Sequence, residues 1–193
     1  MPIIEKWFPT VIYQETDLFN KEQNDIWIAR SLEIQSNTPS GGDEWEGNTY
    51  TTHGSTYNII KDPLFGPLVD MVSNHVYHYV KLHNSKKEYF CESAWLNIST
   101  DRSFQEMHTH NESTISAVYY ISAPPGSGKL VFEDPREPDM LPIKDIPVRN
   151  DLSYVKVGYQ PSAGTLIIFR SYLRHMVTLG TNSEPRISVA FNF

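Results

Sequence analysis

The residue pattern changes after Lys87, and this change limits the fold more than any other feature of the chain. From there to the C-terminus, short runs rich in β-branched and aromatic residues alternate with turn-forming segments, a pattern typical of β-strands. The runs predict strands over residues 89–98, 104–110, 115–122, 128–133, 152–158, 164–169, 175–179 and 186–193. About eight short strands joined by turns favour two packed sheets, as in a jelly roll. The sequence therefore predicts a mainly β fold.

The residues before this region predict supporting helices. Residues 7–13 form a short apolar run that predicts an edge strand, and an apolar stripe at helical spacing predicts a helix over residues 17–34. Asp62 followed by Pro63 is typical of a helix start, so a second helix is expected from residue 63 to about residue 83.

Length and composition indicate one folded unit. The chain has 193 residues with 39% hydrophobic content, which is enough for a substantial core. We expect a single domain over residues 1–193, with a helical part at 1–88 and a jelly-roll core at 89–193. The helices are expected to cover the outside of one sheet.

Charge and cysteine content exclude some classes of protein. The net charge of −7 argues against a general nucleic-acid binder, which needs a basic surface. The single cysteine, Cys91, forms no internal disulfide, which favours a reducing compartment. No apolar run reaches the ~20 residues of a membrane helix, and the N-terminus lacks the apolar region of a signal peptide. We expect a cytoplasmic protein without a nucleic-acid or membrane partner.

Three histidines and an arginine carry the chemistry that the sequence suggests. His108 and His110 are alternate residues of a predicted strand, so both point to one face of it. His175 opens a second predicted strand, and Arg186 opens the last one. Three imidazoles suit a mononuclear redox metal with open coordination positions, and a nearby cation suits an anionic co-substrate. We interpret this pattern as an iron oxygenase site.

Two segments rich in loop-forming residues are candidate lids over such a site. They are residues 35–58 and the proline-rich residues 134–150. His53 lies in the first segment, where a histidine that reaches the site and a solvated one are both compatible with the sequence. The other three histidines, His75, His78 and His83, show no ligand-like pattern.

The second half of the chain resembles a known enzyme family. Beyond His-x-His at 108–110, the motifs are Ser116-Ala-Val-Tyr-Tyr120, Gly128-Lys-Leu-Val-Phe-Glu-Asp-Pro-Arg136 and Arg186-Ile-Ser-Val-Ala-Phe-Asn192. Together they resemble the small oxygenases that use Fe(II) and 2-oxoglutarate on a double-stranded β-helix, a jelly-roll or cupin-like fold. These enzymes are related to prolyl and aspartyl/asparaginyl hydroxylases. The resemblance covers roughly residues 90–193, and the first 60 residues or so match only loosely.

The resemblance implies a set of metal ligands with one departure. It makes His108 and His175 iron ligands, but most of these enzymes have a carboxylate where this chain has His110. Either His110 is the third ligand, or water takes that position, or a carboxylate such as Glu112 or Asp134 reaches the metal. We favour His110, because the strand sets its direction.

The resemblance also implies a co-substrate pocket. Arg186 stands where the family has the basic residue that pairs with the far carboxylate of 2-oxoglutarate, which a planar guanidinium grips with two hydrogen bonds. Ser188 would add a hydroxyl on the same face, and Asn97 would contact the co-substrate. Of Tyr119 and Tyr120, alternation allows one to face inward, and we assign Tyr119 to the pocket.

The implied function is that of an Fe(II)- and 2-oxoglutarate-dependent dioxygenase that consumes O2. We expect it to hydroxylate a peptide side chain or a small polar metabolite, and a homodimer is one option for its assembly. Two alternatives are a cupin-like metal-binding protein with non-redox chemistry and a jelly-roll ligand-binding protein without catalysis. Arg186 argues against the first, because non-redox metal chemistry has no need of a dicarboxylate co-substrate.

Overall fold

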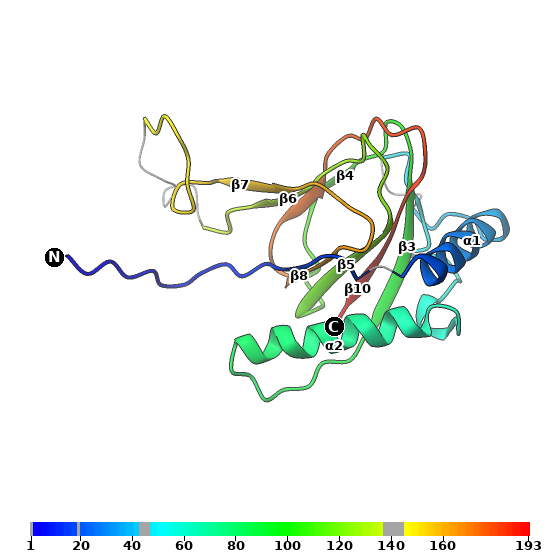
Figure 1. Ribbon diagram of the computed structural model, residues 1–193, viewed down its shortest axis with the longest axis horizontal. Helices are drawn as coiled ribbons and strands as arrows, with labels where there is room; N and C mark the ends of the chain where they lie inside the picture. Colours follow the sequence, from blue (N-terminus) through cyan, green and yellow to red (C-terminus); the bar gives the residue numbers. More distant parts are fainter. Residues whose placement is uncertain (1, 19, 43–46, 137–144) are drawn as a thin grey trace.

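The computed structural model describes residues 2–18, 20–42, 47–136 and 145–193 (Figure 1). Its elements, in chain order, are β1 (Tyr13–Glu15), α1 (Lys21–Asn37), β2 (Tyr50–Thr51), the 3-10 helix η1 (Ile59–Lys61), α2 (Gly66–Leu82), β3 (Ser93–Ser99), β4 (Gln105–His108), β5 (Ile115–Ser122), β6 (Leu130–Glu133), β7 (Lys156–Tyr159), β8 (Leu166–Arg170), β9 (His175–Val177) and β10 (Arg186–Asn192).

Two antiparallel sheets form the body of the molecule. The larger has the order β1-β8-β5-β10-β3-β2, and the smaller has the order β4-β9-β6-β7. Each of the strands predicted after Lys87 is present, as β3 to β10, although several begin or end a few residues from the predicted limits. Neighbouring strands in both sheets are mostly distant in sequence, as the crossovers of a jelly roll require. The predicted mainly β, double-stranded β-helix fold is confirmed.

The larger sheet is covered on both faces. On one face, α1 and α2 pack against it, as Figure 1 shows, with Trp27 and Leu68 among the buried residues. On the other face, side chains such as Tyr120 and Phe169 meet Phe132 of the smaller sheet. Because alternate strand residues point to opposite faces, each strand of the larger sheet supplies both layers.

The N-terminal region differs from the prediction in its details. The first strand is Tyr13–Glu15, which pairs with β8 at the sheet edge, and not residues 7–13. The first helix begins at Lys21, because the Asn20 side chain caps it by accepting a hydrogen bond from the Gln23 amide (3.1 Å). Residues before 89 also add β2 to the larger sheet, so this part is not purely helical.

The second helix begins at Gly66, so the predicted start at Pro63 is wrong. Asp62 does not cap it, because its buried carboxylate accepts hydrogen bonds from Arg30 Nε (2.7 Å), the Leu64 amide (2.9 Å) and the Tyr57 hydroxyl. These bonds tie α1 to the segment that leads into α2. No helix in the described part of the chain is long and apolar enough to cross a membrane.

The charge of Asp62 should stabilise the fold above acidic pH. Burial by itself raises the pKa of this carboxyl, but the bonds from Tyr57, Arg30 and the Leu64 amide outweigh it and hold the pKa below its usual value. The stabilisation is then complete above the unfolded pKa of about 3.9 and is lost as pH falls through the lower folded pKa.

Replacing Asp62 by Asn should lower the free energy of unfolding at pH 7 by about 1–3 kcal/mol, because Arg30 loses its buried charged partner. Urea unfolding at several pH values should show this difference shrinking below about pH 4. Asp25→Asn, which removes an exposed ion pair with Lys21, is the control and should change little. Equal effects of the two substitutions at pH 7 would contradict the stabilising role of Asp62.

Candidate metal centre

Strand pairing in the smaller sheet brings two histidines directly opposite each other. His108 ends β4, His175 begins β9, and the two residues are register partners. Their ring centroids lie 4.2 Å apart. Since cross-strand partners project to the same face of a sheet, both rings point into the space between the sheets.

Backbone acceptors fix the tautomers of these two rings. His108 Nδ1 donates to the Glu106 carbonyl (2.7 Å), and His175 Nδ1 donates to the Leu173 carbonyl (2.8 Å). With Nδ1 carrying the proton in each ring, the lone pair is on Nε2. Hydrogen bonds of this kind are what orient metal-binding histidines in proteins.

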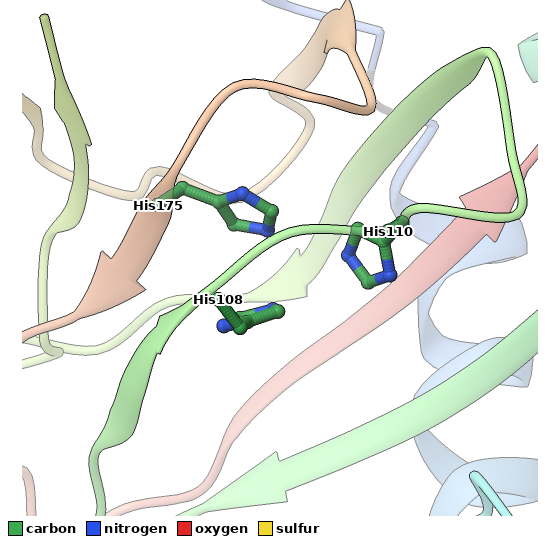
Figure 2. A group of neighbouring side chains, drawn as sticks. All are labelled: His108, His110 and His175. Carbon is green, nitrogen blue, oxygen red and sulfur yellow. The ribbon is translucent and has the colours of Figure 1, made fainter. Parts of the chain in front are cut away.

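His110 joins the pair from outside the strand. Strand β4 ends at His108, so His110 lies in the following turn and not on a strand as predicted. Its backbone amide donates to the Ser171 carbonyl (3.0 Å), and its ring centroid lies 5.1 Å from that of His108 and 5.2 Å from that of His175. Figure 2 shows the three rings gathered around one space. One ligand atom from each residue lies within 4.8 Å of the others, an arrangement that could hold a metal ion.

The three imidazoles are held in their neutral form. Burial, with the neighbouring histidines, lowers the pKa of His110 to about 4 and that of His175 to about 3. Burial also lowers the pKa of His108, against the opposing effect of its hydrogen bond to Glu106. Neutral imidazole is the form that binds metals, and it suits Fe(II) as well as zinc, copper and nickel. The donor set therefore fits an iron ion.

Neither alternative carboxylate belongs to this cluster. Asp134 is paired with Arg136, whose guanidinium lowers the pKa of that carboxyl. Glu112 is exposed at the rim of the adjoining cavity. Within the described residues, the histidines are the sole group of three or more potential ligands.

A cavity of about 630 Å³ adjoins the histidines and has the larger sheet as its floor. The inward-facing residues of β3, β10 and β5 form four rows across this floor. Along the strands, the first row is Ser99 and Arg186, the second Asn97, Ser188 and Tyr120, the third Trp95, Ala190 and Val118, and the fourth Ser93, Asn192 and Ser116. Successive rows are about 7 Å apart, because two strand residues rise about 6.8 Å.

Arg186 is buried at one end of this floor without an ionic partner. The residue is 6% exposed, and its Nε makes no hydrogen bond to any described residue. No described carboxylate lies within ion-pair distance of it, and its guanidinium carbon lies 5.3 Å from the Tyr120 ring centroid. Asn97 Oδ1 is also buried without a partner among the described residues, and the buried Tyr120 hydroxyl has the Arg186 guanidinium as a polar neighbour. An unpaired buried cation is costly, so this end of the cavity suits an anion.

The inward tyrosine is Tyr120, so the assignment of Tyr119 to the pocket is wrong. Tyr119 faces the helices, where its hydroxyl donates to the Leu18 carbonyl (3.0 Å) and its ring packs edge-on against Trp27. The error arose because both faces of β5 are buried, which removes the polar-apolar contrast that normally reveals an inward face. The predicted Asn97, Ser188 and Arg186 all line the cavity.

Some cavity residues were missed by the sequence analysis. Trp95 lies between two imidazoles, with its ring centroid 4.9 Å from His53 and 5.6 Å from His110. Phe169 packs edge-on against His175 at 4.7 Å. Trp95 and Asn97 are alternate residues of β3, so their side chains point to the same face. This alternation could have identified Trp95 as a cavity residue.

The candidate lids reach the cavity unequally. The described part of residues 35–58 contributes Thr49 and His53 to its lining, whereas the described part of residues 134–150 contributes nothing. Residues 43–46 and 137–144 lie outside the described residues.

Comparison with known proteins gives a matching family model and solved structures of similar fold. A family model described as "Putative 2OG-Fe(II) oxygenase" matches residues 93–192, which span β3 to β10 and include the three histidines and Arg186. No curated protein matches the sequence.

Solved structures with a similar fold have low sequence identity to this chain. A prolyl-4-hydroxylase of Pseudomonas putida is 13% identical with a TM-score of 0.65, over 95% of this chain and 92% of that one. A viral collagen prolyl hydroxylase from Paramecium Bursaria Chlorella virus-1, solved with 2-oxoglutarate, is 13% identical with a TM-score of 0.60, over 94% of each chain. HygX of Streptomyces hygroscopicus, solved with nickel, 2-oxoglutarate and hygromycin B, is 11% identical with a TM-score of 0.62, over 94% of this chain and 82% of that one.

Replacing His108 or His175 by Ala should abolish stoichiometric Fe(II) binding, because each supplies a lone pair that no described neighbour can replace. The loss should exceed the 10- to 100-fold effect typical of changing a residue behind a ligand. Isothermal titration under anaerobic conditions measures it, with His78→Ala on the exposed face of α2 as control. Full metal occupancy in either folded variant would refute the assignment.

His110→Ala should also weaken Fe(II) binding, whereas Glu112→Ala and Asp134→Ala should not. The reason is that His110 stands in the cluster and the two carboxylates stand outside it. The same titration distinguishes the three ligand hypotheses. Unchanged affinity in His110→Ala would favour a two-histidine site, and a loss in Glu112→Ala or Asp134→Ala would favour a carboxylate ligand.

Proposed function

We propose that this chain, which belongs to the 2OG-Fe(II) oxygenase family, hydroxylates a peptide side chain or a small polar metabolite at the cluster of His108, His110 and His175. The chain is a 2-oxoglutarate- and Fe(II)-dependent oxygenase by its family and fold. We assign residues 1–193 to one oxygenase domain, because helices and strands before residue 89 pack on the sheet that carries Arg186.

The buried, unpaired guanidinium of Arg186 is the observation that carries the proposal. It lies in the same cavity as the histidines but at the far end of its floor. A dicarboxylate that binds the metal at one end and Arg186 at the other satisfies both groups, as 2-oxoglutarate does in shape and charge. Non-redox metal chemistry gives no reason for this pairing.

The residues around Arg186 complete an anion site. Ser188 on β10 is the register partner of Asn97 on β3 and of Tyr120 on β5. The Ser188 and Tyr120 hydroxyls can donate to a carboxylate, and the Asn97 amide can do the same through Nδ2. We assign these three residues and Arg186 to the binding of 2-oxoglutarate.

Bound iron supplies the activation of O2 that lets the enzyme couple oxidation of 2-oxoglutarate to oxidation of a substrate. The protein's part is to hold the ligands and exclude water. The carbonyls of Glu106 and Leu173 orient the two paired imidazoles, and buried Phe132 and Phe169 cover one side of His175. Such an apolar cover keeps solvent from reaching the metal by that route.

Hydroxylation is supported by the similar structures, which include two prolyl hydroxylases. The anaerobic visible spectrum of the protein with Fe(II) and 2-oxoglutarate tests the first step. The chelate should give its weak charge-transfer band in the wild type and lose it in His175→Ala. A wild-type protein that binds Fe(II) but gives no band would contradict the proposed function.

Arg186→Met should raise the dissociation constant for 2-oxoglutarate by roughly 30-fold to several thousandfold, since losing a buried charged partner costs ~2–5 kcal/mol. Fe(II) binding should remain nearly intact. Arg186→Lys should restore affinity only in part, because an ammonium keeps the charge and loses the planar fork.

Titrating the visible band with 2-oxoglutarate measures these affinities. Arg170→Met is the matched control, because Arg170 is exposed and does not line the cavity. Equal affinity of Arg186→Met and wild type for 2-oxoglutarate would refute the role of Arg186 and favour a protein that binds another ligand.

A further inference from the structure

We infer that the fourth row of the cavity floor, around Asn192, is the substrate subsite and that it takes a cationic molecule with an amide carbonyl, such as a basic residue of a peptide. This inference rests on the proposed function and narrows its substrate class. It follows from the hydrogen bonds of Asn192, the position of its row, and the charges at the adjoining rim.

The amide of Asn192 is oriented by the protein but left with free donors. Ser116 Oγ donates to Asn192 Oδ1 (2.9 Å), and Ser116 Oγ is itself hydrogen-bonded to Ser171 Oγ (2.9 Å). In this arrangement Oδ1 faces Ser116 and Nδ2 faces the cavity. Asn192 as a whole is 8% exposed and lines the cavity, and its Nδ2 donates to no described residue. An NH2 group open to the cavity can donate to an acceptor on a bound molecule, such as a carbonyl oxygen.

The fourth row lies at the opposite end of the floor from Arg186. Asn192 is six residues after Arg186 on the same strand, which places the two about 20 Å apart along it. The histidines lie over the third and fourth rows, because His110 contacts Trp95 and His175 contacts Phe169, the β8 partner of Ser116. A co-substrate held between Arg186 and the histidines leaves the fourth row free for the molecule that is oxidised.

The charges at this end of the cavity are negative. Glu92 directly precedes the fourth row, and its backbone amide donates to the Asn192 carbonyl (2.9 Å). Glu112 follows His110 by two residues, and both carboxylates are exposed and line the cavity. Among the described lining residues, the one lysine or arginine is Arg186 at the far end. The rim therefore attracts a cation and repels a carboxylate.

These features together define a ligand with two parts. The carbonyl acceptor meets Asn192 Nδ2 in the buried part of the subsite. The cationic group extends to the rim, where Glu92 and Glu112 remain in contact with solvent. A basic residue within a peptide has both parts, whereas an acidic peptide or a dicarboxylate metabolite would bring like charges together.

Three blocked amino acids test the inference, namely the N-acetyl N-methylamides of lysine, norleucine and glutamate. They share both amide groups and differ in side-chain charge. Binding to the anaerobic protein loaded with Mn(II) and 2-oxoglutarate is measured by the relaxation that Mn(II) induces in the probe protons. We expect the lysine probe to bind about three- to tenfold more tightly than the glutamate probe, with norleucine between them.

Variants separate the two parts of the subsite. Asn192→Ala should weaken binding of all three probes by about three- to tenfold, because they share the carbonyl acceptor. Ser116→Ala should weaken them less, since it frees the Asn192 amide to turn, and it carries the test if Asn192→Ala fails to fold. Glu92→Gln with Glu112→Gln should bring the lysine and norleucine probes to equal affinity. Glu22→Gln on α1 is the control and should leave every affinity unchanged.

The affinity of each protein for 2-oxoglutarate is measured separately by the visible band with Fe(II). If 2-oxoglutarate binds the wild type normally, the inference is overturned by any of three results. These are a glutamate probe that binds as tightly as the lysine probe, a lysine probe that does not bind at tens of millimolar, or full probe affinity in both folded Asn192→Ala and Ser116→Ala. If the wild type does not bind 2-oxoglutarate, the proposed function itself has failed.

Discussion

Burial of the larger sheet on both faces is the constraint on which the rest of the structure depends. One face meets the helices through residues such as Trp27 and Tyr119, and the other meets the smaller sheet or lines the cavity. Because the side-chain period of a strand is two, a slip of one residue in β10 would move Arg186 and Asn192 out of the cavity together. The apolar contacts on the helix side therefore fix the position of the polar groups on the cavity side.

The histidine cluster depends on strand pairing in the smaller sheet. His108 and His175 are cross-strand partners, and each gives its Nδ1 proton to a nearby backbone carbonyl. Burial keeps the rings neutral, so their lone pairs stay available at physiological pH. In the proposed site, three neutral imidazoles would leave a bound ferrous ion with its full positive charge. That charge would strengthen the attraction of an anionic co-substrate.

The cavity lies between the histidine cluster and the floor formed by the larger sheet. The charge and polarity of its lining change along that floor. A buried cation stands at one end, apolar side chains such as Val118 and Ala190 lie in the middle, and an oriented amide with two rim carboxylates stands at the other. One strand, β10, supplies the cation, a hydroxyl and the amide at alternate positions. With the proposed assignments, such a gradient would let one site distinguish an anionic co-substrate from a substrate of opposite charge.

Much of this could be predicted from the sequence. Turn residues and β-branched runs located each strand after Lys87, and the motifs around the histidines and Arg186 resembled the oxygenase family whose model matches residues 93–192. These features are local, so neighbouring residues suffice to show them. The family motifs could not identify the third ligand position, because there this chain has His110 where most relatives have a carboxylate.

The sequence by itself determined where the strands lie along the chain and which types of residue are available for chemistry. The tertiary structure decided which side of β5 faces inward, because Tyr119 and Tyr120 are both fully buried and alternation alone does not tell the two faces apart. It also decided that His110 reaches the cluster from a turn and that Asp62 binds Arg30 and does not cap α2. Each of these outcomes depends on partners distant in sequence, and packing alone brings such partners together.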